Sequence, residues 1–322
     1  MPTLLHYRPW QGTFHSPWWS VWPIARVSLG MLFRRKLFWT LYACGLLLFL
    51  MFFFGAYLLA WAESQVAVSA QQLKMGDPSR LLTGLKRALG IINGSQATFQ
   101  YFFAYQGGIV IVTLALAGSL LVGDDFTFKS LVFYLAKPIN RWQYILGKSL
   151  AVAIIVQMMT TLPALVLFGQ HAFDDWDYLL DVNYFTDSGG SGPAGIPLLL
   201  AVLAYGTILS VFLSILLVAT ATCMRRTMPL IMVWISMFFF LRLLANVLVD
   251  GLKYDARFRL LDIWNNLTLL GQACLGFTHE ELEKAANRPF PEFWEAGLIL
   301  AGVCAICLIY LNHRTRGVEI VS

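Results

Sequence analysis

The stretch IPLLLAVLAYGTILSVFLSILLVATAT, residues 196–222, runs for 27 residues without a charged side chain. A helix rises ~1.5 Å per residue, so about 20 apolar residues cross a hydrocarbon core that is ~30 Å thick. The stretch is therefore long enough to be a transmembrane helix. Five further runs have a similar length and a predominantly apolar composition: 37–60, 101–122, 149–169, 228–249 and 293–311.

The overall composition agrees with this reading. The chain has 322 residues, of which 58% are hydrophobic and only 13% are charged, whereas soluble domains are about 45–50% apolar and about 25% charged. A soluble enzyme or binding module is thereby excluded. The sequence predicts an all-α integral membrane protein with six transmembrane helices, organised as one transmembrane domain over residues 1–322.

The positions of the basic residues predict the orientation. If both termini are cytoplasmic, the inner segments hold thirteen Lys and Arg against three Asp and Glu, and the outer segments hold nine against fifteen. Short inner loops of multi-span proteins carry such an excess of bases. We therefore expect a multi-pass protein of the inner (cytoplasmic) membrane, with loops 61–100, 170–195 and 250–292 outside. The net charge of +5 needs no nucleic acid partner, because an anionic inner leaflet attracts these bases.

Two segments outside the apolar runs also have helical patterns. Residues 24–36, IARVSLGMLFRRK, mix apolar and basic side chains, which is typical of a helix at the lipid headgroups. In the outer loop 250–292, Thr278 followed by Glu281 forms the pattern of a capping box, and Pro289 ends the segment. We expect an interfacial N-terminal helix and a short helix after Thr278.

The most polar inner segment is VGDDFTFKSLVFYLAKPINRWQYILGKSLA, residues 122–151. Its Lys129-Ser130 and Lys148-Ser149 pairs look like pieces of a phosphate-binding loop, which needs Gly-x-x-x-x-Gly-Lys-Ser/Thr. The glycines required are missing, because Trp142 and Phe128 stand in their places. The chain is therefore not expected to bind or hydrolyse a nucleotide itself.

The same segment predicts two helices joined by a turn. Asp124 or Asp125 can cap a helix that begins near Phe126, and Pro138 ends it because the residue before proline leaves the α region. Asn140 then caps a new helix that starts at Arg141 and enters the third span. The first of these helices is apolar nearly all round, so we expect a partner protein to cover part of it. Residues 123–148 are called the elbow below.

These residues also carry a family resemblance. An acid pair after the second span, then Leu135-Ala136-Lys137-Pro138-Ile139-Asn140-Arg141-Trp142 and Tyr144-x-x-Gly147-Lys148, resemble the signature of ABC-2 type transporter permeases. The branch most similar to it is that of six-span bacterial permeases of the gliding-motility and nitrous-oxide-reductase-maturation kind. The chain departs from the usual pattern at Lys129-Ser130-Leu131, where those relatives usually have Gly-Thr-Leu.

The resemblance implies a function. It implies a permease subunit, expected to be an exporter, that is not an enzyme and works with a separate ATP-binding-cassette subunit, which would bind the ATP. It implies that the elbow is a coupling helix and that a second permease copy or a paralogue completes the pathway. The residues expected to contact the ATPase are Asp124, Asp125, Lys129, Lys137, Pro138 and Arg141.

The sequence does not name the substrate. Arg242 lies about 20 Å into the fifth span at ~1.5 Å per residue, and a charge at such depth is a candidate for the transport pathway. It could instead reach the outer surface or pair with Asp250. No catalytic, cofactor or metal site is predicted. The sequence has no Gly-x-Ser-x-Gly or His-Glu-x-x-His motif, and the five cysteines form no framework.

Two other functions stay open at this point. An ion-coupled secondary transporter would be expected to bury carboxylates in its spans, and here the predicted spans hold none away from their ends. A membrane scaffold or assembly protein without transport activity is the other alternative. Co-purification of an ATP-binding-cassette protein would distinguish a permease from both.

Overall fold

The computed structural model describes residues 17–72, 92–123, 140–174, 176–181, 194–224, 226–286 and 288–319. Every regular element in these ranges is helical. The elements are, in chain order, η1 (Pro17–Ser20), α1 (Val21–Phe33), α2 (Lys36–Gln72), α4 (Gln96–Gly118), η2 (Ser119–Gly123), α7 (Arg141–Met159), α8 (Thr161–Asp174), α9 (Trp176–Leu180), α10 (Gly195–Met224), α11 (Thr227–Ile235), η3 (Ser236–Phe240), α12 (Leu241–Asn246), η4 (Val247–Gly251), η5 (Ala256–Leu261), α13 (Ile263–Cys274), α14 (His279–Ala286) and α15 (Phe293–Glu319).

Six of these helical stretches are long and apolar enough to cross a membrane, which confirms the predicted all-α membrane fold. They are Lys36–Gly55, Gln96–Gly123, Arg141–Phe173, Gly195–Met224, Thr227–Gly251 and Phe293–Arg314. Several helix ends lie beyond the predicted span ends. Helix α2 continues to Gln72 instead of 60, α4 begins at Gln96 instead of 101, and α15 continues to Glu319 instead of 311. Helix α7 begins at Arg141, where the sequence predicted a new helix after Asn140.

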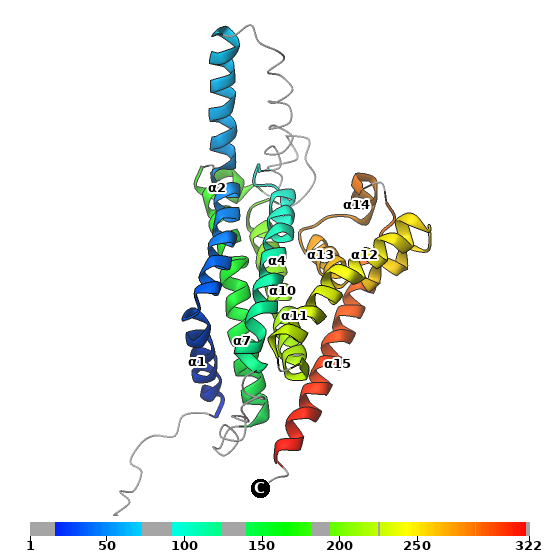
Figure 1. The fold of residues 1–322 in the computed structure, drawn as a ribbon. Coiled ribbons are helices and arrows are strands. Elements are labelled where there is room, and N and C mark those ends of the chain that lie inside the picture. The colour runs from blue at the N-terminus through cyan, green and yellow to red at the C-terminus, as the bar shows by residue number, and fades with distance from the viewer. Residues whose placement is uncertain are drawn as a thin grey trace, which may run out of the picture.

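The bundle has a packed centre and less covered flanks. Helices α4, α7 and α10 pack against one another at the centre, and α1 runs alongside α7 (Figure 1). The fifth span, α11 to η4, and α15 lean away from this centre in the same view. In the second, third and fourth spans, 56–69% of the residues in the most apolar 18-residue stretch are buried inside the protein. In the first, fifth and sixth spans the buried share is only 17–22%. Lipid or another chain must therefore cover the flanks.

The third span is broken at Thr160, between α7 and α8. Pro163 has no backbone N–H, so the carbonyl of Met159, four residues earlier, has no intrahelical donor. Gln106 of α4 supplies one, because its Nε2 donates to the Met159 oxygen at 2.7 Å. An unpaired backbone carbonyl costs several kcal/mol in hydrocarbon. Gln106 is therefore buried in the second span because Pro163 leaves the Met159 carbonyl of the third span without a backbone donor.

Glycines let neighbouring helices approach this break. A Cβ on Gly45 of α2 would lie 2.7 Å from Gln106 Nε2, and a Cβ on Gly206 of α10 would overlap the side chain of Thr161. Neither Gly45 nor Gly206 could carry a larger side chain without moving its neighbour. The first, second, third and fourth spans meet here.

The segment after the fifth span does not stay at the surface. Trp264 of α13 packs onto Gly107 of α4, and Gly271 of α13 packs onto the ring of Tyr205 in α10. Gly107 and Tyr205 lie about 15 Å along their helices from Gln96 and Gly195 at ~1.5 Å per residue, so α13 turns back into the bundle. The prediction of an outer loop over 250–292 did not include this packing, because the apolar pattern of α13 is too short to be read as a span.

The predicted helix after Thr278 is confirmed. Helix α14 begins at His279, and the two halves of the capping box are present: Thr278 N donates to Glu281 Oε2 at 3.1 Å, and Glu281 N donates to Thr278 Oγ1 at 3.4 Å. The helix ends at Ala286, three residues before Pro289.

Candidate functional site

The site predicted from sequence is the elbow. The structure describes its two ends, residue 123 and residues 140–148, which we call its flanks together with the helices that they belong to. Asp124, Asp125, Lys129, Lys137 and Pro138 fall in residues 124–139, outside the described part of the chain. The incoming flank is η2, the π-helical end of the second span, and the outgoing flank is the first turn of α7. We call this end of the bundle the elbow end.

Arg141 is the first residue of α7, as predicted. Asn140 precedes it with an extended backbone, φ −70° and ψ 145°. The backbone N–H of Asn140 donates to the side-chain oxygen of Gln143 at 2.9 Å. Gln143 therefore satisfies a backbone donor just outside the helix, as in a capping box, and fixes the direction in which the chain leaves the elbow.

A buried hydrogen bond joins the two flanks. Lys148 of α7 donates from Nζ to the carbonyl oxygen of Leu121 in η2 at 2.6 Å. The Lys148 side chain is buried, with 1% relative exposure, and its Nζ lies 5.8 Å from the centre of the Tyr144 ring. A cation near the carbonyls at a helix end is favourable. The second and third spans are thus linked directly at the point where the elbow joins them.

Sequence reasoning missed this role of Lys148. It counted the residue as one of the inner bases and as part of an incomplete phosphate-binding motif. A lysine inside an otherwise apolar helical run was the available signal, because a long charged side chain is rarely fully buried without partners. The identity of its partner depends on how two spans distant in sequence pack together.

Helix α1 packs on α7 beside Lys148, at Gly147. A Cβ on Gly147 would lie 2.8 Å from two atoms of Ile24 and 3.1 Å from the carbonyl oxygen of Val21. The absence of a side chain at 147 is therefore what lets α1 lie flat on α7. Ile24, Leu121, Gly147 and Lys148 together are called the elbow junction below.

The second candidate site, Arg242, lies at the other end of the bundle. Arg242 is exposed on α12, between the π-helical segments η3 and η4. The alternative pairing with Asp250 is not found, because the two carboxylate oxygens of Asp250 accept from Arg259 at 2.8 Å and from Arg288 at 3.1 Å. The guanidinium of Arg259 also lies 4.8 Å from the centre of the Phe290 ring.

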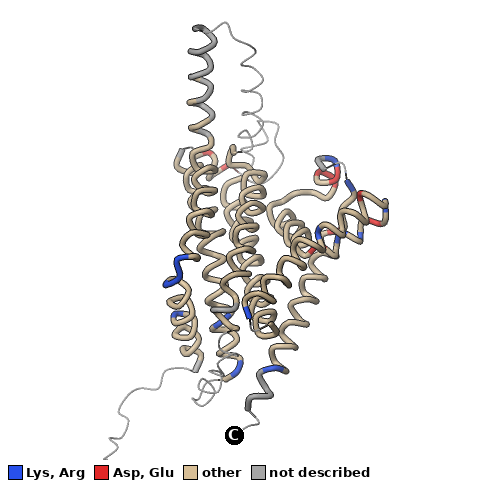
Figure 2. The backbone as a smooth tube through the Cα atoms, in the orientation of Figure 1, with Lys and Arg blue, Asp and Glu red and all other residues tan. Residues whose placement is uncertain are grey.

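A buried carboxyl lies within electrostatic reach of Arg242. Asp262 caps α13, and its side chain accepts from Trp264 N at 3.0 Å. Burial raises the pKa of Asp262 above its ordinary value, and the hydrogen bonds and the charges of Arg242 and Arg259 offset part of that rise. Arg242 therefore acts electrostatically on the start of α13, the helix that turns back into the bundle. In Figure 2, the acidic residues coloured red lie at this end of the molecule.

The family comparison covers most of these elements. The model of the ABC-2 family transporter protein matches residues 22–274, from the second residue of α1 to the last residue of α13. The chain belongs to this family. No curated protein matches the chain.

Membership of the ABC-2 family makes the chain a transport subunit. It is a membrane-embedded permease of the ABC transporter class, and permeases of this class work with an ATPase subunit. The match names the family and no narrower branch. Within the permease, the matched region includes the elbow junction and both partners of the Gln106–Met159 hydrogen bond.

Proposed function

We propose that this permease exports its substrate by using ATP hydrolysis in a separate ATP-binding-cassette subunit, which docks on the elbow at the cytoplasmic face. The observation that supports this most directly is the bond between Lys148 and Leu121, because it ties both flanks of the elbow to each other. A push on the elbow would then move the second and third spans together. The ATP would be bound by the partner.

Within the elbow we propose a role for each predicted contact residue. Asp124 and Asp125 cap the first helix and meet bases of the ATPase, and Lys129 lies on the face that docks. Pro138 fixes the turn. Lys137 and Arg141 contact the groove of the ATPase, as the resemblance to gliding-motility and nitrous-oxide-reductase-maturation permeases implies.

We also propose that two permease chains, or this chain and a paralogue, surround the pathway. The uncovered faces of the first, fifth and sixth spans leave room for such a contact. Arg242 is proposed to face the pathway. Mass measurement of the complex in native lipid should give two permease and two ATPase chains, and one permease chain with full transport activity would contradict the dimer.

The coupling role is tested by Lys137→Glu combined with Arg141→Glu. The matched control reverses two other bases of the elbow end, Arg26→Glu with Arg314→Glu, which lie outside the elbow. Both double variants should insert, since the remaining inner bases still set the orientation. Only the first should lose ATPase co-purification or ATP-driven transport.

Two results would contradict this function. If the Lys137 and Arg141 variant inserts, retains the ATPase and transports at the normal rate, the elbow is only a membrane anchor. If no ATP-binding-cassette protein co-purifies with the unmodified chain, the scaffold function is favoured instead.

A further inference from the structure

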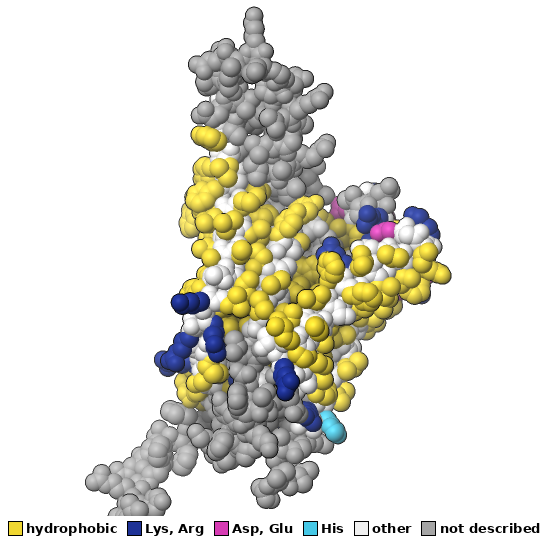
Figure 3. Space-filling view, in the orientation of Figure 1, with side chains coloured by type: hydrophobic (Ala, Val, Ile, Leu, Met, Phe, Trp, Pro, Cys, Tyr) yellow, Lys and Arg dark blue, Asp and Glu magenta, His cyan; other side chains and the backbone are white. Residues whose placement is uncertain are grey.

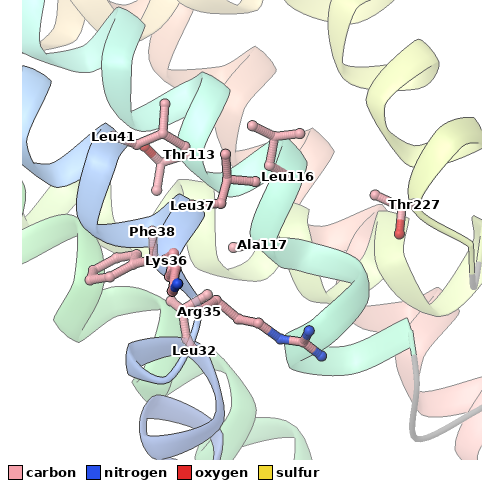
Figure 4. A pocket seen from close by; sticks show the side chains of 10 residues that line it. All are labelled: Leu32, Arg35, Lys36, Leu37, Phe38, Leu41, Thr113, Leu116, Ala117 and Thr227. Carbon is pink, nitrogen blue, oxygen red and sulfur yellow. The ribbon is translucent and has the colours of Figure 1, made fainter.

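A groove of about 300 Å³ opens where α1 passes into α2. Figure 4 shows that α2, α4 and the first residue of α11 surround it. Its walls are hydrocarbon for the most part, from side chains such as Leu37, Leu41, Leu116 and Ala117. Thr113 also presents little polarity there, because its hydroxyl donates to the Ile109 carbonyl at 2.8 Å.

Two cations stand at one edge of this apolar groove. Arg35 and Lys36 belong to its lining, and both residues are exposed. None of the residues that line it is acidic, and neither cation forms an ion pair within the described part of the chain. Figure 3 shows dark blue basic side chains at the lower edge of the apolar surface.

The start of α2 adds to the positive potential at the same edge. Lys36 is the first residue of a helix of 37 residues, and the first backbone N–H groups of a helix attract anions such as phosphate. The groove therefore combines hydrocarbon walls with a cationic edge, in the arrangement that an anionic amphiphile requires.

A tryptophan places this edge at the level of lipid headgroups. Trp39, in the first turn of α2, is exposed beside Lys36 and donates from its indole to the Phe33 carbonyl at 2.8 Å. Exposed tryptophans of membrane proteins concentrate where the bilayer meets water. The groove thus opens from the headgroup region towards the hydrocarbon.

We propose that this groove binds one anionic glycerophospholipid, with part of an acyl chain between α2 and α4 and the phosphate at Arg35, Lys36 and the start of α2. A free phosphate would leave the apolar walls uncovered, and a neutral amphiphile would leave both cations unpaired. The lipid would bridge the first, second and fifth spans. This site is independent of the proposed coupling to an ATPase.

Native mass spectrometry of the full-length chain tests the site. The delipidated chain is titrated with phosphatidylglycerol or with phosphatidylethanolamine of the same acyl chains. We expect one phosphatidylglycerol to bind before all others, and Arg35→Gln with Lys36→Gln to weaken it by about tenfold or more, because each base near an anionic lipid contributes appreciably to binding. Inorganic phosphate in excess should not displace the lipid.

Two control variants separate the groove from general surface charge. Arg26→Gln with Arg314→Gln removes two bases of the elbow end that do not line the groove, and it should retain the tight site. Leu116→Trp fills the groove without changing charge, and it should weaken binding of both lipids. Each variant is first checked for an unchanged elution volume and melting temperature; Arg35→Gln alone replaces a double variant that fails this check.

The proposal is wrong if the two lipids bind equally, if the control pair of bases lowers binding as much as the groove pair, or if Leu116→Trp has no effect. Cross-linking of two permease chains through Leu37→Cys, with no retained lipid, would show that the groove is a subunit contact. Displacement by inorganic phosphate alone would show a simple anion site.

Discussion

Lys148, the last residue of the elbow, donates a hydrogen bond of 2.6 Å to the carbonyl of Leu121, although 27 positions separate the two residues in the sequence. The bond closes the elbow into a loop whose base is fixed on α7 and η2. Any force applied to the elbow is transmitted through this base, because the π-helical η2 continues directly from α4.

Replacement of this lysine should loosen the base of the elbow. Lys148→Met keeps much of the side-chain volume and leaves the Leu121 carbonyl without this donor, which costs about 1–3 kcal/mol for a buried group. We expect a drop in Tm of several degrees in thermal unfolding of the purified chain. Lys284→Met, at an exposed lysine of α14, is the control and should leave Tm unchanged. Equal melting of the two variants would contradict a structural role for the bond.

Gly147→Ala should separate α1 from α7. The new methyl group would lie 2.8 Å from Ile24, so α1 has to shift away. The control is Gly30→Ala on α1, where an added Cβ meets no atom within 4 Å. An alanine is about 0.5–1 kcal/mol better than glycine inside a helix, so Gly30→Ala should raise Tm slightly while Gly147→Ala lowers it. A rise in Tm for both would show that α1 does not pack here as described.

The sequence predicts the spans and the local helix caps of this protein, but not the side-chain bonds between spans. The six spans were predictable because each apolar run is as long as a bilayer is thick. The start of α7 after Asn140 and the cap at Thr278 were predictable because capping is a local interaction. The partners of Lys148 and Gln106 were not, since each side chain bonds a carbonyl on another span.

The re-entry of α13 was hidden for a different reason. Twelve residues are too few to register as a span, and the helix packs on α4 and α10 through two glycines, Gly107 and Gly271, that have no special pattern in the sequence. The elbow itself, which the family motif singles out, has only its flanks in the described residues.

Asp262 predicts a pH dependence of stability. Burial raises the pKa of its carboxyl in the folded chain above the ordinary value of 3.8. Between 3.8 and the raised pKa the folded chain holds a proton that the unfolded chain releases, so stability falls as pH rises through this window. Asp262→Asn removes the titration and keeps the helix cap, since Asn and Asp cap about equally well.

We therefore expect Asp262→Asn to raise Tm at pH 7.5, on the order of 2 °C, and to have a smaller effect near pH 4. Asp255→Asn is the control, because Asp255 is an exposed cap that accepts from Arg257 N at 3.2 Å. Asp255→Asn should not raise Tm at pH 7.5, because the side chain that it replaces is exposed. A lower Tm for Asp262→Asn at pH 7.5 would mean that the attraction to Arg242 and Arg259 outweighs the cost of burial.

The break in the third span gives the most specific prediction, because two substitutions should compensate each other. Gln106→Met removes the donor to the Met159 carbonyl, and polar contacts of this kind contribute about 0.6–1.7 kcal/mol in membranes. Pro163→Ala restores a backbone N–H four residues after Met159, so the carbonyl regains an intrahelical donor. Once that donor exists, the carbonyl no longer depends on Gln106.

A double-mutant cycle measures this dependence. Gln106→Met should lower the free energy of unfolding by about 1 kcal/mol in the natural background and by much less in the Pro163→Ala background, which gives a coupling energy above the usual additivity error of about 0.5 kcal/mol. Gln157→Met is the matched control: Gln157 Nε2 donates to Ser210 Oγ at 3.0 Å and makes no use of the freed carbonyl. Its cost should be the same with and without Pro163. If Gln106→Met is equally costly in both backgrounds, the glutamine stabilises the bundle by some other contact, and the break in the third span does not explain why it is there.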